Sequence, residues 1–198
     1  ETRRAYRREH PADSWEDRGL NDRCMFTTGL PIVPSAYNNN VHLFQTPDHV
    51  VMLIEMTHTL RVVPLDGRPH GNIRQFVGDS RGHWEGDTLV VETIHFNDRL
   101  DGGDLQPSHI IQTTHRGSGE TLRLVERFTP TDANTIDYRF TVEDPRTFTT
   151  SWSAVIPMTS HGAPDAMFEY ACHEGNDALA NVLSGARYEE RVEVQGSR

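Results

Sequence analysis

Residues 82–96, with the sequence GHWEGDTLVVETIHF, decide the fold of this chain. The run from Thr88 to Phe96 is β-branched and apolar, and the triplet Glu85-Gly86-Asp87 before it is typical of a tight turn. This pattern predicts a hairpin in which one strand ends at Trp84 and a longer strand follows the turn. Because the rest of the chain also alternates short apolar runs with Gly, Pro, Asn and Asp, it indicates an all-β protein.

Two segments on either side of Asp144-Pro145-Arg146 alternate most regularly. The first carries apolar side chains on one parity, at Ile136, Tyr138, Phe140 and Val142. The second continues this pattern at Phe148, Thr150, Trp152, Ala154, Ile156 and Met158. Such alternation is typical of an antiparallel sheet with one buried and one wet face. We therefore expect a hairpin across this turn, with Trp152 deep in the core.

Further strand candidates are spaced by turn residues along the chain: 41–46, 50–56, 60–65, 109–115, 121–128 and 167–172. Helices are expected only at the two ends, over residues 1–10 and after an Asn176 cap. About eight to ten short strands predict an antiparallel barrel or a sandwich. We favour a closed or nearly closed, calycin-like barrel, because closure removes exposed strand edges. The expected divisions are a helical arm and connector at 1–34, the barrel at 35–175, and a helix and tail at 176–198.

The charge balance excludes several classes of function. The net charge is −10, and all 19 basic residues are Arg, since the sequence contains no Lys. A chain without Lys has no Schiff-base lysine and no phosphate-loop lysine. An acidic chain is also a poor general binder of nucleic acid. No apolar run is long enough to span a membrane as a helix, so we expect no membrane span.

Several long segments of the sequence resemble an uncharacterised family of bacterial exported proteins. They are HPADSWEDRGLNDRC (10–24), QTPDHVVMLIEM (45–56), PLDGRPHGNIRQFVGDSRGHWEGDTLVVET (64–93), LVERFTPTDANTIDYRFTVEDP (124–145) and FEYACHEGN (168–176). The resemblance implies a periplasmic or extracellular location and a segment taken from a longer, processed precursor. No activity is known for that family, so the resemblance assigns no catalytic residue.

Two cysteines, Cys24 and Cys172, lie near opposite ends of the chain. An even count suits either one disulfide or two buried thiols. In a chain that resembles exported proteins we predict the disulfide, because such bonds persist in oxidising compartments. The sequence contains no CxxC motif and no Cys/His spacing typical of zinc, so we expect neither a metal nor any other cofactor.

Four residues are candidates for acid–base chemistry. His58 continues the apolar parity of residues 50–56, and Arg61 follows it closely. A buried His beside a charged neighbour can act as a general acid or base. His95 and Asp98 stand near the end of the strand in residues 88–96, where a barrel mouth would place polar groups around a ligand. For each of the four, a purely structural role is the alternative.

Three functional hypotheses follow from these observations. The first is an exported barrel that binds a small apolar or aromatic ligand through Met52, Tyr138, Phe140 and Trp152. The second is a cofactor-independent hydrolase or lyase that uses His58, Arg61, His95 and Asp98. The third is a structural component of the cell surface that assembles with neighbouring copies through its terminal arms.

Overall fold

The computed structural model describes residues 13–15, 23–24, 30–34, 37–97, 120–160 and 167–196. The chain divides into two compact units. One unit is Thr28–Tyr170, and the other combines Glu1–Thr27 with Ala171–Arg198. The predicted helix over residues 1–10 and the predicted strand over 109–115 lie outside the described residues.

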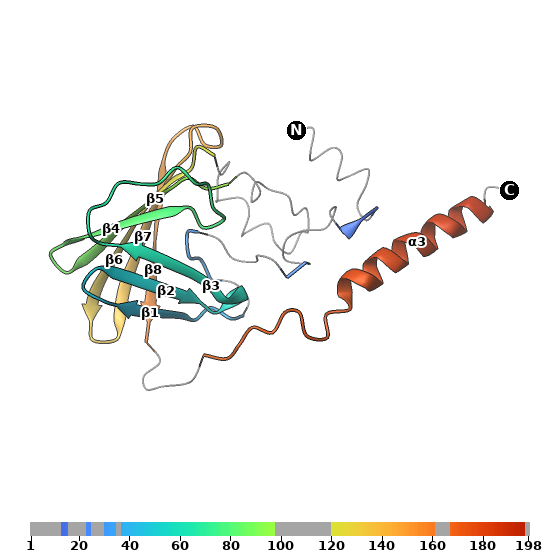
Figure 1. Ribbon diagram of the computed structural model, residues 1–198, viewed down its shortest axis with the longest axis horizontal. Helices are drawn as coiled ribbons and strands as arrows, with labels where there is room; N and C mark the ends of the chain where they lie inside the picture. The colour runs from blue at the N-terminus through green and yellow to red at the C-terminus, as the bar shows by residue number, and fades with distance from the viewer. Residues whose placement is uncertain are drawn as a thin grey trace. The chain divides into compact units, whose positions relative to one another are not determined.

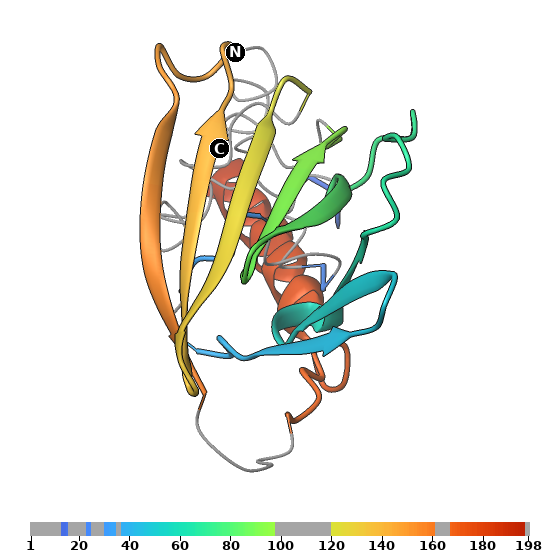
Figure 2. The ribbon, with the colours of Figure 1, turned by 90° about the vertical axis from the view of Figure 1, so that its left-hand side faces the viewer.

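The strands of the larger unit form two antiparallel sheets, which lie across one another in Figure 2 (Figures 1 and 2). The three-stranded sheet has the order β1 (Val41–Gln45), β2 (His49–Ile54) and β3 (Thr59–Pro64). The five-stranded sheet has the order β4 (Asp79–Glu85), β5 (Thr88–Ile94), β6 (Arg123–Asp132), β7 (Thr135–Glu143) and β8 (Trp152–Thr159). The antiparallel all-β prediction is confirmed. Within the described residues neither sheet closes on itself, so the closed barrel stays a prediction.

The hairpin predicted from residues 82–96 is formed by β4 and β5. Glu85 pairs with Thr88, which leaves Gly86 and Asp87 as a two-residue turn. Gly86 has a φ of 60°, a conformation that costs glycine little and other residues more. The first strand therefore ends at Glu85, one residue later than predicted. Gly82 brings the two sheets close together, since a Cβ there would lie 2.8 Å from a side-chain carbon of Val63.

One hydrophobic core lies between the sheets. Its fully buried members on the strands are Val50, Met52 and Val63 from the small sheet and Leu89, Val91, Leu124, Phe128, Tyr138, Phe140 and Val142 from the large one. On β7 the buried residues alternate with more exposed ones, as the sequence pattern predicts. The parity rule therefore assigns the buried face of β7 correctly.

The hairpin between β7 and β8 has a longer loop than predicted. Trp152 pairs with Val142, so β8 begins four residues after Phe148. The buried Asp144 organises this loop: its carbonyl accepts the Phe148 N–H at 2.9 Å and its carboxylate accepts the Arg146 N–H at 3.2 Å. Trp152 is partly buried against Phe140, with ring centroids 5.7 Å apart, and it lies at the margin of the core.

Two further sequence expectations differ from the structure. Residues 167–172 form no strand, although their apolar character suggested one. The sequence pattern predicts that the strand of residues 50–56 could continue to His58. In the structure β2 ends at Ile54, because the short 3-10 turn η2 (Met56–His58) follows. Thr57 and His58 have φ values of 56° and 50°, which no extended strand allows.

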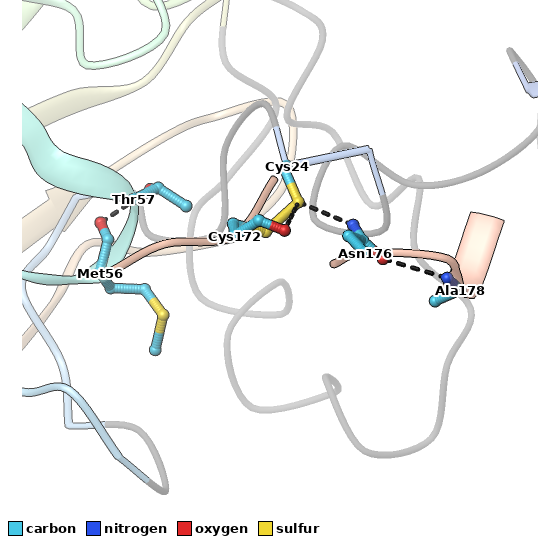
Figure 3. Close-up of a disulfide and its surroundings, with 6 residues drawn as sticks. All are labelled: Cys24, Met56, Thr57, Cys172, Asn176 and Ala178. Carbon is cyan, nitrogen blue, oxygen red and sulfur yellow. Dashed lines mark hydrogen bonds between the residues drawn. A yellow bond between two sulfur atoms is a disulfide. The ribbon is translucent and has the colours of Figure 1, made fainter. Parts of the chain in front are cut away.

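The smaller unit contains the disulfide and the C-terminal helix. Cys24 and Cys172 are joined with their Cα atoms 5.6 Å apart, which confirms the predicted disulfide (Figure 3). The side-chain amide of Asn176 lies 2.9 Å from the Cys24 sulfur, and its Oδ1 accepts the Ala178 N–H at 3.2 Å. Helix α3 (Ala178–Gly196) follows this cap. None of the helices in the described ranges is long and apolar enough to cross a membrane.

The β7 alternation generates a stability prediction. Phe140→Ala should lower the free energy of unfolding by about 3–5 kcal/mol, since it empties a fully buried site. Arg139→Ala, on the exposed parity of the same strand, should cost well under about 1 kcal/mol. Denaturant titration monitored by circular dichroism measures both. Equal losses would show that the two faces of β7 are misassigned.

Candidate functional site

A buried ion pair joins the two sheets. Arg61 lies on β3 and Glu126 on β6, and their side chains are 1% and 0% exposed. One Nη2–H of Arg61 donates to Glu126 Oε2. Both residues occupy the inward parity of their strands, beside Val63 on β3 and between Leu124 and Phe128 on β6. The core therefore contains a charge of each sign.

Polar side chains from the large sheet complete the surroundings of this ion pair. The Arg61 Nε–H donates to Ser80 Oγ at 2.9 Å, and Nη2 donates to Thr93 Oγ1 at 2.6 Å. The Tyr138 hydroxyl donates to Glu126 Oε1 at 2.7 Å. We call Arg61, Ser80, Thr93, Glu126 and Tyr138 the interior polar cluster. It draws on β3 and on four strands of the large sheet.

The connector before β1 also contacts this cluster. The backbone N–H of Ile32 donates to the Tyr138 hydroxyl oxygen at 2.9 Å. Arg61 reaches a further soft acceptor through Nη1, which lies 3.8 Å from the Met52 sulfur. The cluster thus connects three parts of the larger unit: the connector, the small sheet and the large sheet.

Tyr138 stays protonated in this environment. Its burial raises the pKa of the phenol well above the usual value, and the nearby charge of Glu126 raises it further. A neutral phenol can donate to the carboxylate, which is the geometry observed. Because the members of the cluster satisfy one another, its chemistry is that of a structural fastening between the sheets.

The structure brings together several of the predicted site residues. Met52, Arg61 and Tyr138 meet in and around the interior polar cluster. Phe140 lies beside Tyr138, with ring centroids 5.5 Å apart, and Trp152 lies beside Phe140. Met52, Tyr138 and Phe140 are fully buried members of the core. A ligand-binding role for these residues stays a prediction.

The other predicted catalytic residues lie in separate places. His58 stands in the η2 turn with its side chain 49% exposed, and its Nε2 lies 3.7 Å from Glu169 Oε1. His95 follows β5 with a φ of 58°. In the part of the chain that the structure describes, no hydrogen bond or ion pair joins His58, Arg61 and His95 to one another. Asp98 lies outside the described residues.

A second group of charged residues lies at the surface around His70. Its Nδ1 lies 3.2 Å from Asp79 Oδ2, and its Nε2 lies 3.4 Å from Glu92 Oε1. The His95 ring is its neighbour, with centroids 6.4 Å apart. Burial raises the pKa of Asp79, but hydrogen bonds from the Gly71 N–H, Arg81 and His70 outweigh it, so that the net pKa is lowered. This group fastens the loop after β3 to the large sheet.

The outer face of the small sheet is unusual for a surface. It consists of the residues that point away from the core, which are His42, Phe44, His49, Val51, Leu53, Leu60, Val62 and Pro64. Three of them are strongly exposed: Phe44 at 46%, Leu60 at 56% and Val62 at 48%. We call this set the outer face. It contains no Asp, Glu or Arg.

The large sheet shows the opposite character on its outward side. Ion pairs cross from strand to strand there: Arg123 bridges Glu92 and Glu143, and Arg127 pairs with Glu85. An antiparallel sheet usually turns a polar face to water in this way. The three strands of the small sheet carry one charged residue, Arg61, and it points into the core. The outward side of the small sheet therefore contains no Asp, Glu or Arg.

Sequence reasoning missed Glu126 and the outer face. Glu126 lies on the same parity as Leu124 and Phe128, so a charge on an apolar face was the available signal. The outer face had a signal too, because residues 50–56 alternate weakly and are apolar on both parities up to Glu55. No such signal marked Ser80 or Thr93, whose roles depend on the position of Arg61.

Comparisons with known proteins do not place this chain in a family. No family model, no curated protein and no solved structure matches the chain. Among the described residues, no group of three or more His, Cys, Asp or Glu side chains is placed to hold a metal ion. The outer face and the interior polar cluster are therefore judged on their own geometry.

The interior polar cluster generates a test by paired substitution. Arg61→Met alone should destabilise the protein by about 3–5 kcal/mol, because it leaves the Glu126 carboxylate buried without its partner charge. The double variant Arg61→Met/Glu126→Leu should be more stable than Arg61→Met, since it removes both charges. Urea unfolding measures the three proteins. A double variant less stable than Arg61→Met would contradict the fastening role.

Proposed function

We propose that the protein is an exported structural component that assembles with copies of itself through the outer face. The observation that carries this proposal is an outer face without Asp, Glu or Arg, with Phe44, Leu60 and Val62 exposed, on a chain of net charge −10. Contiguous apolar surface on a folded domain is typical of a binding site. The proposal uses the fold in its coarser form, two antiparallel sheets around one core, and does not depend on a closed barrel.

The charge distribution favours a second copy as the occupant of the outer face. Two chains of net charge −10 repel each other, so like copies can meet only where their surfaces are uncharged. A partner of opposite charge would instead be expected to meet carboxylates, and the outer face has none. The exposed Phe44, Leu60 and Val62 are side chains whose burial against an identical face would be favourable.

Export to the periplasm or the cell exterior is part of the same proposal. The Cys24–Cys172 disulfide supports it, since disulfides persist in oxidising compartments and are rare in the bacterial cytosol. A surface component must also avoid non-specific contacts, and the charged outward side of the large sheet suits that need.

A pair of matched substitutions tests the outer-face contact. Val62→Glu should weaken self-association by at least about tenfold, because the new carboxylate would be buried or would face its own copy. Val155→Glu is the control, since Val155 is 45% exposed, close to the 48% of Val62, but lies on the large sheet. Sedimentation velocity over a range of concentrations measures the association. Equal loss in both variants, or a wild type that never associates, would reject the proposal.

Binding of a small apolar or aromatic ligand is a second candidate function. One observation favours it: the inward residues of β8, which are Trp152, Ala154, Ile156 and Met158, are only partly buried, whereas Tyr138, Phe140 and Val142 on β7 are fully buried. Apolar surface therefore remains accessible along the margin of the core. The acid–base hypothesis for His58, Arg61, His95 and Asp98 stays a prediction.

Fluorescence tests the ligand hypothesis. A panel of apolar and aromatic compounds should shift or quench the emission of the protein, and Trp152→Phe should remove that response because Trp152 would line the site. The chain contains 3 Trp residues, so Trp84→Phe is the matched control at an exposed position on β4. A response that persists in Trp152→Phe would place the ligand elsewhere.

A further inference from the structure

Strand β1 is the edge of the small sheet as the described strands form it. Of the described strands only β2 is paired with it, and four of its five residues are exposed. Native proteins usually protect such edges with charged residues, Pro or bulges. The sequence of β1, VHLFQ, contains neither a charged residue nor Pro, and its pairing with β2 is regular from Val41 to Gln45.

Two backbone hydrogen bonds show which groups of β1 point toward the open side. The Glu55 N–H donates to Asn40 O at 3.0 Å, and the Thr46 N–H donates to His49 O at 2.9 Å. In an antiparallel pair the hydrogen-bonding direction alternates from residue to residue. The even-numbered residues of this segment therefore pair with β2. Val41, Leu43 and Gln45 present their N–H and C=O groups at the open edge.

We propose that β1 pairs antiparallel with β1 of a second copy about a two-fold axis at Leu43. This contact is distinct from the outer face, and it rests on the proposed assembly role. The two small sheets would join into one continuous sheet, and Val41 of one copy would face Gln45 of the other. Leu43, which is 38% exposed although it lies on the inward parity opposite Met52, would then be covered by its symmetry mate.

We assign the partner of this edge to a second copy of the chain, because β1 is complementary to an antiparallel copy of itself. An antiparallel pairing about a two-fold axis needs a short, regular strand without charges, since each side chain then meets its own kind or a near neighbour. Like charges opposite each other would be destabilising, and β1 contains no Asp, Glu or Arg. The His42 and Phe44 rings, with centroids 4.2 Å apart, would extend the outer face across the junction.

Two different contacts on one protomer have a geometric consequence. An isologous contact alone closes into a dimer. A copy that carries both an edge contact and an outer-face contact joins one neighbour through each, so the assembly grows beyond a dimer, and it grows as an open chain where the two two-fold axes do not intersect. The inference therefore specifies a filament or extended oligomer, whereas either contact by itself would produce a discrete dimer.

Leu43→Pro tests the edge contact. Proline removes the N–H at position 43, which points to the open edge, and leaves the N–H groups that pair with β2 in place. Gln45→Pro is the second variant, because its N–H also points outward and its side chain is exposed, so no core packing is lost. Circular dichroism and thermal unfolding of the full chain establish that each variant remains folded.

Sedimentation velocity and negative-stain electron microscopy distinguish the two contacts. The wild type should form extended chains, Leu43→Pro and Val62→Glu should each form discrete dimers, and the double variant should be a single copy. A folded Leu43→Pro or Gln45→Pro that still forms chains would overturn the edge contact. Val62→Glu as a single copy would also overturn it, with the outer-face proposal intact. Chains that persist in Val62→Glu but not in Leu43→Pro would reject the outer face and keep the edge contact.

Discussion

The ion pair between Arg61 and Glu126 is the constraint on which the arrangement of the two sheets depends. In the described residues no β-ladder connects the small sheet to the large one, so side chains must hold them together. A buried guanidinium is tolerated only where its donors are satisfied, and Ser80, Thr93 and Glu126 satisfy them from the large sheet. A displacement of β3 would leave a buried charge unpaired, which costs about as much free energy as emptying a fully buried apolar site.

Two other features keep the sheets at the distance that this ion pair requires. Gly82 lets β4 approach Val63 closely, since even a Cβ at that position would collide with the neighbouring side chain. Tyr138 links the carboxylate of Glu126 to the backbone of Ile32, so the connector before β1 is held by the same group of polar atoms. The interior polar cluster therefore lies within the larger unit and is surrounded by the apolar side chains of the core.

The outer face of the small sheet contains no Asp, Glu or Arg. The one Arg, Asp or Glu residue in the small sheet is Arg61, and it pairs with Glu126 inside the core. The remaining side chains of β1, β2 and β3 are apolar, polar without charge, or His. The large sheet instead arranges its charges as pairs across its outward side. The same unit thus has one outward surface crossed by ion pairs and one outward surface without Asp, Glu or Arg.

The sequence by itself determined the all-β class, the hairpin around Gly86, the buried parity of β7 and the disulfide between Cys24 and Cys172. These features depend on turn residues, period-two alternation and cysteine count, which are local or compositional properties. The tertiary structure alone decided that β2 ends at Ile54 and that the η2 turn places His58 at the surface. It also decided that the Asp144 loop delays β8 to Trp152 and that Arg61 meets Glu126. The physical reason is that each of these features includes a contact between different segments, which no local pattern specifies. Arg61 donates to Glu126. Glu55, just before η2, accepts from the Asn40 N–H, and Asp144 accepts from the Thr121 hydroxyl.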